Sequence, residues 1–195
     1  MEIRTVTGPD MTQWLNEVAR LRIQVFRAYP YLYDGDPDYE ARYLAQFATA
    51  PDSTLVLALN DDRVVGCATA MAMRGADAEF RRPFEQAGEE TERFFYFGES
   101  VLEPAFRGQG IGHRFFDARE ARARECGARF ATFCAVQRPA DHPDRPGDYR
   151  PLDAFWQGRG YRRRDDLGTR FAWKDIGQAE ETAKPMVFWT RELAA

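Results

Sequence analysis

Apolar residues recur at helical spacing in the first part of the chain. Trp14, Val18, Leu21 and Val25 fall on one face of a helix that we expect to begin after Asp10, which stands at capping-box spacing from Gln13. Further amphipathic or turn-bounded stretches predict helices at 39–48, 78–87, 111–125 and 152–158.

Short runs rich in β-branched and aromatic residues separate these helices. They predict strands at 2–6, 54–60, 64–73, 93–102, 129–136, 169–175 and 186–192. The dipeptide Asp61-Asp62 between the second and third runs is typical of the turn of a β-hairpin. No repeat or linker interrupts the alternation of strands and helices, so we expect one mixed α/β domain over residues 1–195.

Composition excludes several classes of protein. The chain has 195 residues, 44% hydrophobic and 30% charged, which is ordinary for a soluble domain, and a formal charge of −4 gives no general attraction to nucleic acid or anionic membrane. Three cysteines without a CxxC pair and two histidines predict no metal site. Without a signal segment or a long apolar stretch, we expect a cytoplasmic protein.

Basic residues are almost all arginine: only Lys174 and Lys184 are lysines among the 27. Four of these arginines lie in the helix predicted at 111–125, whose apolar face carries Ile111, Phe115 and Ala118. We expect those four to face water on the rest of the helix; they are Arg114, Arg119, Arg122 and Arg124.

A glycine-rich turn joins the strand at 93–102 to this helix. Its sequence is Arg107-Gly108-Gln109-Gly110-Ile111-Gly112. Glycines allow backbone N–H groups to converge at a helix N-terminus, where the helix dipole favours a phosphate, and Arg107 adds a permanent positive charge. His113-Arg114 excludes a Walker loop, and the glycine spacing fits a dinucleotide motif badly. A tight turn without a ligand is the alternative.

Two segments resemble one family. The run from Val101 to Gly112 resembles the acetyl-CoA-binding motif of the GNAT (GCN5-related) N-acetyltransferases, whose core is [RQ]-x-x-G-x-[GA]. Downstream, Phe155-Trp156-Gln157-Gly158-Arg159-Gly160-Tyr161 is similar to the F-Y-x-x-x-G-[FY] segment of that family. Both occur in the order that the family has, with one predicted strand between them.

The resemblance implies an α/β (α+β) fold: a mixed, mostly antiparallel sheet splayed at two parallel strands, here 93–102 and 129–136, with helices on both faces. It also implies a bacterial-type N-acetyltransferase that passes the acetyl group of acetyl-CoA to a primary amine by direct attack in a ternary complex. The acceptor would be a small molecule or an amino-terminal group, and the protein a monomer or homodimer without a metal. The residues implied in acetyl-CoA binding are Ser100, Val101, Leu102, Arg107, Gly108, Gln109, Gly110, Ile111, Gly112 and His113.

Proton transfer is assigned to residues near the expected acetyl position. Glu99 is the candidate base, directly or through water, although it could equally be a structural acceptor for an arginine. Tyr96 is a second candidate on the same strand. Trp156 replaces the tyrosine that serves the family as general acid, and an indole cannot donate a proton, so either Tyr149 serves or the thiolate leaves unaided. We expect Cys134 to be buried and inert.

The acceptor side is expected in the connector between the first two helices. Its aromatic and acidic residues could bind a cationic amine by stacking and charge, and the candidates are Tyr31, Tyr33, Asp34 and Asp36. A rigid, solvated connector is the alternative. The proline-containing loop at 137–150 would form a semi-rigid lip. Two alternatives to an enzyme remain: a non-catalytic acyl-CoA sensor and a homo-oligomeric scaffold with a vestigial loop.

Overall fold

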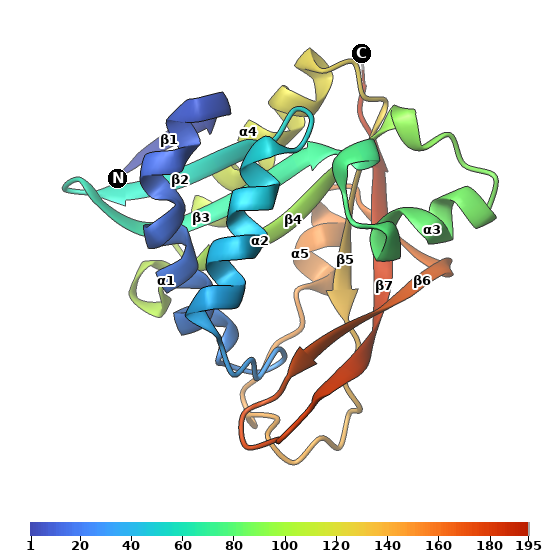
Figure 1. Ribbon diagram of the computed structural model, residues 1–195. Helices are drawn as coiled ribbons and strands as arrows, with labels where there is room; N and C mark the ends of the chain where they lie inside the picture. Colours follow the sequence, from blue (N-terminus) through green and yellow to red (C-terminus); the bar gives the residue numbers. More distant parts are fainter. Residues whose placement is uncertain (195) are drawn as a thin grey trace.

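A seven-stranded sheet runs through the molecule in the order β1-β2-β3-β4-β5-β7-β6 (Figure 1). The computed structural model describes residues 1–194. The strands are β1 Glu2–Thr7, β2 Thr54–Asn60, β3 Arg63–Ala72, β4 Phe94–Leu102, β5 Phe130–Val136, β6 Arg162–Lys174 and β7 Glu181–Glu192. Only β4 and β5 pair in parallel, and the other neighbours are antiparallel.

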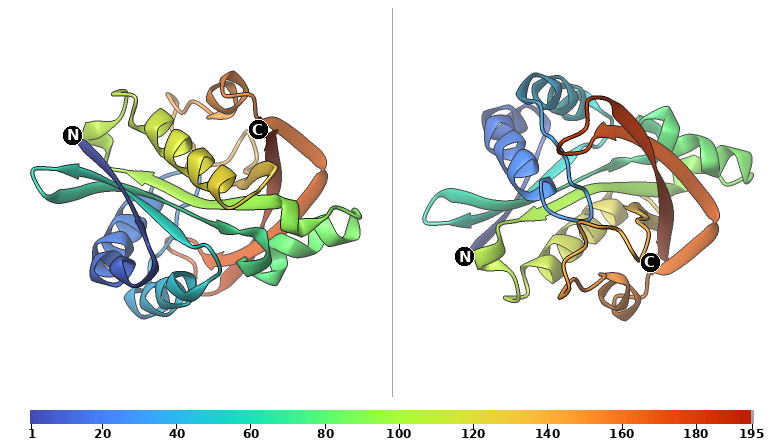
Figure 2. Two further views of the ribbon diagram at one scale, coloured as in Figure 1. Left: turned by 90° about the horizontal axis from the view of Figure 1, so that it is seen from above. Right: turned by 90° about the horizontal axis from the view of Figure 1, so that it is seen from below.

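Helices cover both faces of the sheet (Figure 2). Helices α1 (Leu15–Phe26) and α2 (Pro37–Thr49) lie together on one face, and α4 (Ile111–Glu125) and α5 (Asp153–Gly158) lie on the other. The short α3 (Ala78–Gln86) packs against β6. The predicted fold class, a mixed, mostly antiparallel sheet with helices on both faces, is therefore confirmed.

Strand β2 shows how the sequence pattern builds the two halves of the core. Leu55, Leu57 and Leu59 belong to the cluster under α1 and α2, whereas Val56 and Ala58 pack with residues of α4. This alternation follows from the two-residue period of a strand, and burial on both faces explains why the run is continuously apolar. The predicted hairpin is also confirmed, with Asp61 and Asp62 at φ of 49° and 63°.

The parallel pair β4–β5 is short. Phe94, Phe95 and Tyr96 pair with residues 130–132, and no pairing between the two strands continues beyond Tyr96 in the described residues. From this point β4 stays paired with β3 through Leu102, while β5 stays paired with β7 through Val136. The predicted splay is confirmed, and it leaves one edge of the second half of β4 without a strand partner.

A β-bulge interrupts β4 where the splay begins. Ala68 pairs with Ser100 and Ala70 with Phe97, so Gly98 and Glu99 both lie opposite Thr69. A Cβ at position 98 would come 2.5 Å from Thr69 Oγ1, which leaves room only for glycine. Glu99 N donates to the same Oγ1 at 3.2 Å. The extra residue changes the parity of side-chain directions along the strand.

Several predicted elements differ in their bounds; β7, for example, begins at Glu181 and not at residue 186. A 3-10 helix, Gly8–Trp14, precedes α1, and Gln13 donates its side-chain N–H to the Asp10 carbonyl, so Asp10 is not the cap that we predict. Strand β6 begins at Arg162, earlier than predicted, because its first residues (Arg162 to Asp166) are all charged and conceal the strand pattern. Among the described residues, no helix combines the length and apolar character needed to cross a membrane.

Candidate functional site

A cavity of about 100 Å³ lies on the α1–α2 face of the sheet, beside the bulge. Its wall comes from α1, α2, α3, the strands β4 to β7 and the connector between the first two helices. Most of the lining side chains are aromatic: Phe26, Tyr31, Tyr33, Tyr39, Tyr43, Phe80, Tyr96, Phe171 and Trp173. Arg22 and Glu99 are the charged residues of the wall in the part of the chain that the structure describes.

Glu99 takes part in a buried cluster with Arg22 and Glu40. The Arg22 guanidinium donates to one Glu40 oxygen and lies 2.7 Å from Glu99 Oε2. Burial alone would lower the pKa of Arg22, but the two carboxylates outweigh it and raise that pKa, so the guanidinium stays charged. Glu99 Oε1 is buried without a hydrogen-bond partner among the described residues, which leaves an acceptor at the cavity wall.

The hydroxyl of Tyr96 connects the two splayed strands. It lies 3.4 Å from Cys134 Sγ, and both residues line the cavity. Burial raises the pKa of the Cys134 thiol to about 12, so the sulfur is a neutral partner at physiological pH. Burial also raises the pKa of Tyr96 well above its ordinary value. A neutral O–H group therefore sits where backbone pairing between β4 and β5 ends.

Arg119 supports the bulge from the opposite face of the sheet. It is 1% exposed, and its guanidinium donates to the carbonyls of Thr69 and Glu99 at 3.4 and 3.3 Å and to Ser100 Oγ at 2.8 Å. The group also stacks over the rings of Phe97 and Phe116. The prediction that Arg119 faces water is wrong, because the bulge exposes backbone carbonyls that its donors satisfy.

The glycine-rich turn before α4 presents a row of backbone donors. Gly108 and Gly110 have φ of 75° and 77°, a conformation that side chains other than glycine rarely adopt. Within the described residues, the N–H groups at positions 108–113 have no intramolecular acceptor. Since these donors stand at the N-terminus of α4, the turn offers an anion site.

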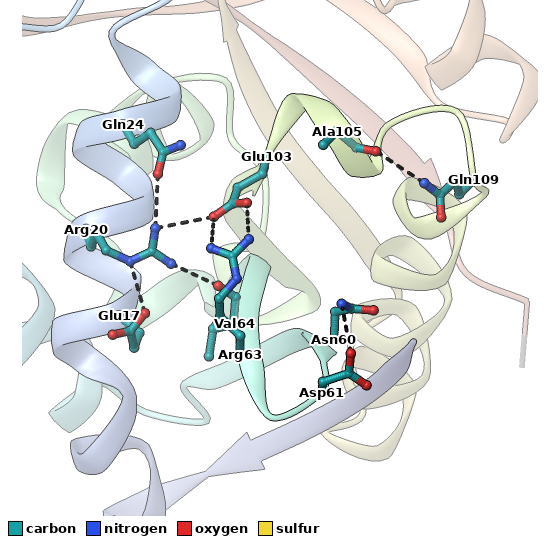
Figure 3. Close-up of polar contacts among 10 residues, drawn as sticks. All are labelled: Glu17, Arg20, Gln24, Asn60, Asp61, Arg63, Val64, Glu103, Ala105 and Gln109. Atoms are coloured by element: carbon teal, nitrogen blue, oxygen red, sulfur yellow. Dashed lines mark hydrogen bonds and ion pairs between the residues drawn. The ribbon is translucent and has the colours of Figure 1, made fainter.

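Glu103 fixes the entry to this turn (Figure 3). Its carboxylate accepts two hydrogen bonds from Arg63, at 2.9 and 2.6 Å, and one from Arg20 of α1 at 3.3 Å. The Arg63 hydrogen bond is the main reason that the pKa of Glu103 is lowered. The Gln109 side chain donates to the Ala105 carbonyl within the turn. The end of β4 is thus tied to α1 and to the β2–β3 hairpin.

Comparison with known protein families shows to which family the chain belongs. The model of the acetyltransferase (GNAT) family matches residues 15–146, which include α1, the bulge, the glycine-rich turn and β5. The chain belongs to the GNAT acetyltransferase family. No curated protein matches it.

Solved GNAT structures share the fold at low sequence identity. Ribosomal-protein-alanine N-acetyltransferase of Brucella melitensis superposes with a TM-score of 0.64 and 14% identity, over 99% of this chain and 100% of that one. A GNAT family acetyltransferase of Elizabethkingia anophelis with acetyl-CoA bound gives 0.55 and 14%, over 98% and 97%. An aminoglycoside 6'-N-acetyltransferase complexed with coenzyme A gives 0.58 and 15%, over 100% and 98%.

The candidates for acetyl-CoA binding occupy two segments of this GNAT domain. Ser100, Val101 and Leu102 lie on β4 beyond the splay, and the turn residues carry the unpaired N–H groups. The Arg107 guanidinium folds back on the Leu102 carbonyl at 3.3 Å. His113 is exposed and lies 3.1 Å from an Arg159 nitrogen. The side chain of Ile111 is buried against the sheet, so only its backbone faces the turn.

The proton-transfer candidates separate in space. Glu99 and Tyr96 line the cavity. Tyr149 lies in the loop after β5, packs edge-to-face on Tyr29 and is absent from the cavity wall. Trp156, at the position of the tyrosine in the family motif, packs against Phe133 and Trp189 on the opposite face of the sheet.

The acceptor candidates separate in the same way. Tyr31 and Tyr33 line the cavity, and Arg138 holds the connector by donating to the Tyr31 carbonyl at 2.8 Å. Asp36 caps α2 by accepting from the N–H groups of residues 38 and 39, and Asp34 pairs with Lys174 at 2.8 Å. Neither carboxylate is part of the cavity wall, so Glu99 is the acidic residue of that wall in the described part of the chain.

Sequence reasoning did not find Arg22, Glu40 or Arg119. A signal was available, because each charged residue stands on the apolar face of its helix. Arg22 follows Val18 by one helical turn, and Arg119 follows Phe115 by the same spacing. A charge in a predicted apolar stripe indicates a buried partner, but the partners lie on other elements and only the fold reveals them.

Proposed function

We propose that this GNAT domain is an N-acetyltransferase that transfers the acetyl group of acetyl-CoA to a primary amine by direct attack in a ternary complex. The observation that carries the proposal is the carboxylate of Glu99, with one unpartnered oxygen, at the wall of a cavity beside the splay. A group that accepts a proton thus lies next to the place where the family resemblance puts the acetyl group.

The chain's own residues fit the co-substrate. We assign the pyrophosphate to the N–H groups of residues 108–113, whose donors lack other acceptors among the described residues. Arg107 stands at the edge of this turn as an additional charge. We assign the pantetheine arm to the edge of β4 at Ser100 to Leu102 that β5 leaves free. Backbone N–H groups on this edge would stabilise the developing oxyanion.

During the reaction the nitrogen of the ammonium ion loses two protons, one before attack and one after it, and the departing sulfur takes up one. The acceptor arrives as an ammonium ion and gives a proton to Glu99 Oε1, directly or through one water, while Arg22 holds Oε2. The free amine then attacks the thioester carbonyl, a C–N bond forms, and the C–S bond breaks as the sulfur takes the electron pair. The attacking nitrogen gives up its second proton, which balances the proton that the departing sulfur takes up. Positioning both substrates supplies much of the acceleration.

Tyr96 is the hydroxyl best placed to protonate the departing thiolate. It lies at the last paired position of β4, with its O–H directed to Cys134 on β5. Tyr149 is the second candidate, and its partly buried position in the loop after β5, outside the cavity wall, makes it dependent on movement of that loop. Departure of the thiolate without an acid is the third route.

Thiol release from acetyl-CoA in the presence of an amine panel tests the function, together with acetyl-CoA binding measured by thermal shift. Gly110→Glu places a carboxylate in the proposed phosphate site and should abolish binding. Gly88→Glu is the matched control, since Gly88 has a φ of 73° and an open environment after α3. Binding of acetyl-CoA without thiol release would indicate an acyl-CoA sensor. If the wild type does not bind acetyl-CoA, both the acetyltransferase and the sensor hypotheses are overturned.

A further inference from the structure

The cavity wall has an unusual composition for a site that accepts an amine. Nine aromatic side chains line it, several in direct contact with one another. Phe80 stacks between Tyr96 and Phe171 at centroid distances of 5.0 and 5.2 Å, and Tyr31 contacts Trp173 at 5.8 Å. Such rings remove apolar surface from water and attract cations to their faces.

Charge is scarce and unbalanced in this wall. The buried cluster has two carboxylates, Glu40 and Glu99, and one guanidinium, Arg22. Glu40 is fully buried and Glu99 is 7% exposed, so neither carboxyl group has more than slight contact with water. An uncompensated buried charge is costly, and one cation next to Glu99 Oε1 would balance the cluster.

The same cluster disfavours a second cation. Arg22 is itself part of the cavity wall, and no carboxylate other than Glu99 lines it in the described chain. A polyamine or aminoglycoside would have to place further ammonium groups among rings and beside a guanidinium. The volume of about 100 Å³ is several times the roughly 10–15 Å³ that one water needs. This space is enough for the apolar part of a small acceptor molecule.

We propose, resting on the function above, that the acceptor is a small monoamine whose amino group is joined to an aromatic or short apolar body. The ammonium group lies at Glu99 Oε1, and the apolar body lies among the rings of Tyr39, Tyr43, Phe80 and Phe171. Specificity arises because Glu99 is the one carboxylate of this wall among the described residues, so the further ammonium groups of a polycationic acceptor would lose their water without finding a second anion.

Two measurements test the substrate class. In the first, thiol release is compared for phenethylamine, isoamylamine, spermidine, kanamycin and a short peptide with a free amino terminus. We expect kcat/KM for the two apolar monoamines to exceed the others by about tenfold or more. A preference for spermidine, kanamycin or the peptide would overturn the substrate class and leave the proposed acetyltransferase function standing.

The second measurement does not depend on turnover. Calorimetry compares phenethylamine with 2-phenylethanol, which has the same body and no charge. We expect the amine to bind more tightly by about tenfold or more, and Glu99→Gln to remove the difference. If no amine is acetylated but this difference in affinity is found, the proposed acetyltransferase function fails, and the proposal that the cavity binds apolar monoamines holds. Equal binding, or no binding of the amine, would overturn the class.

A charge placed in the wall provides a matched pair of variants. Phe171→Asp adds a second carboxylate on β6 and should lower kcat/KM for phenethylamine while raising that for a diamine, reversing their order. Ala172→Asp is the control, because Ala172 is the next residue on the strand, exposed and outside the cavity wall. An unchanged order in Phe171→Asp would show that these rings do not select the acceptor.

Discussion

Arg119 Nη1 donates a hydrogen bond to the main-chain carbonyl of Glu99 at 3.3 Å, from the face of the sheet opposite to the Glu99 side chain. On the cavity face, Arg22 holds the carboxylate of the same residue at 2.7 Å. The proposed base is therefore fixed by one arginine through its backbone and by another through its side chain. Both arginines are buried, one from α4 and one from α1.

Arg119→Met should lower the free energy of unfolding by about 3 kcal/mol. The substitution keeps most of the side-chain volume but removes the charged guanidinium that donates hydrogen bonds to buried carbonyls. Burial lowers the pKa of Arg119 to about 10, so the group is charged at neutral pH and the loss is that of charged donors. Urea unfolding measures the effect. Arg114→Met, on the exposed side of the same helix, should change stability by less than about 0.5 kcal/mol. Equal losses of stability in the Arg119→Met and Arg114→Met variants would contradict the role of Arg119 in supporting the bulge.

Glu99→Gln should reduce turnover about 100-fold and leave acetyl-CoA affinity unchanged, since the glutamine keeps the shape but cannot take the proton. The deficit should shrink as the pH approaches roughly 10, where an alkylamine loses its proton unaided. Steady-state rates from pH 6 to 10 check this. Turnover equal to wild type throughout would leave Glu99 as a structural acceptor for Arg22.

Tyr96→Phe and Tyr149→Phe distinguish the two hydroxyls. Removing the Tyr96 hydroxyl should lower kcat by about tenfold or more, because that group lies in the cavity beside the splay, whereas Tyr149→Phe should have little effect. Comparison of kcat with an activated thioester, whose leaving group needs no acid, provides the control. The opposite order of the two variants would assign the acid to the loop after β5.

Asp175→Asn should destabilise the connector that carries Tyr31. Asp175 accepts two hydrogen bonds from Arg138, at 2.9 and 3.0 Å, and lies 3.1 Å from Lys184. Burial tends to raise its pKa, but these two cations outweigh burial, and the pKa lies below 3.8. A lowered pKa means that the stabilisation is fully present above about pH 4 and is lost as the pH falls further.

We expect this variant to lose about 3 kcal/mol of stability at pH 7, since two buried cations lose their partner. The difference from wild type should shrink when unfolding is followed from pH 5 down to pH 2. Asp148→Asn, at an exposed loop position, is the control and should follow the wild-type curve. A difference that stays constant to pH 2 would contradict the assignment.

Cys134 should resist alkylation in the folded protein. Burial raises the pKa of its thiol to about 12, so at pH 8 only about one thiol in 10,000 is a thiolate. Cys126 is partly exposed and should react first with iodoacetamide. Peptide mapping by mass spectrometry gives both rates, with urea-unfolded protein as the reference for full reactivity. Rapid labelling of Cys134 at pH 8 would show that its sulfur is not held as a neutral thiol.

Local signals in the sequence were sufficient for much of the fold. The Asp61-Asp62 turn and the glycine-rich turn require backbone conformations that few residues adopt, so they mark their positions unaided. The continuous apolar run of β2 and the spacing in α1 report burial directly. The first half of strand β6 was not predicted, since its first residues are charged and its place in the sheet depends on pairing with β7.

The direction of Glu99 could not be derived from the sequence. Phe95 and Phe97 point to the α4 face, so simple alternation would send residue 99 there as well. The bulge at Gly98 and Glu99 turns the side chain to the cavity face instead, and a bulge depends on the register with β3, which is a contact between distant segments.

The sequence by itself thus determined the elements, the phosphate-type turn and the identity of a carboxylate on the central strand, because these depend on neighbours along the chain. Only the tertiary structure decided that Arg22, Glu40 and Arg119 are buried, that Trp156 lies away from the cavity, and that rings from three helices, two strands and the connector between α1 and α2 meet around Glu99. The reason is physical: a buried charge is tolerable only beside its partners, and each of these charged groups has partners on other elements.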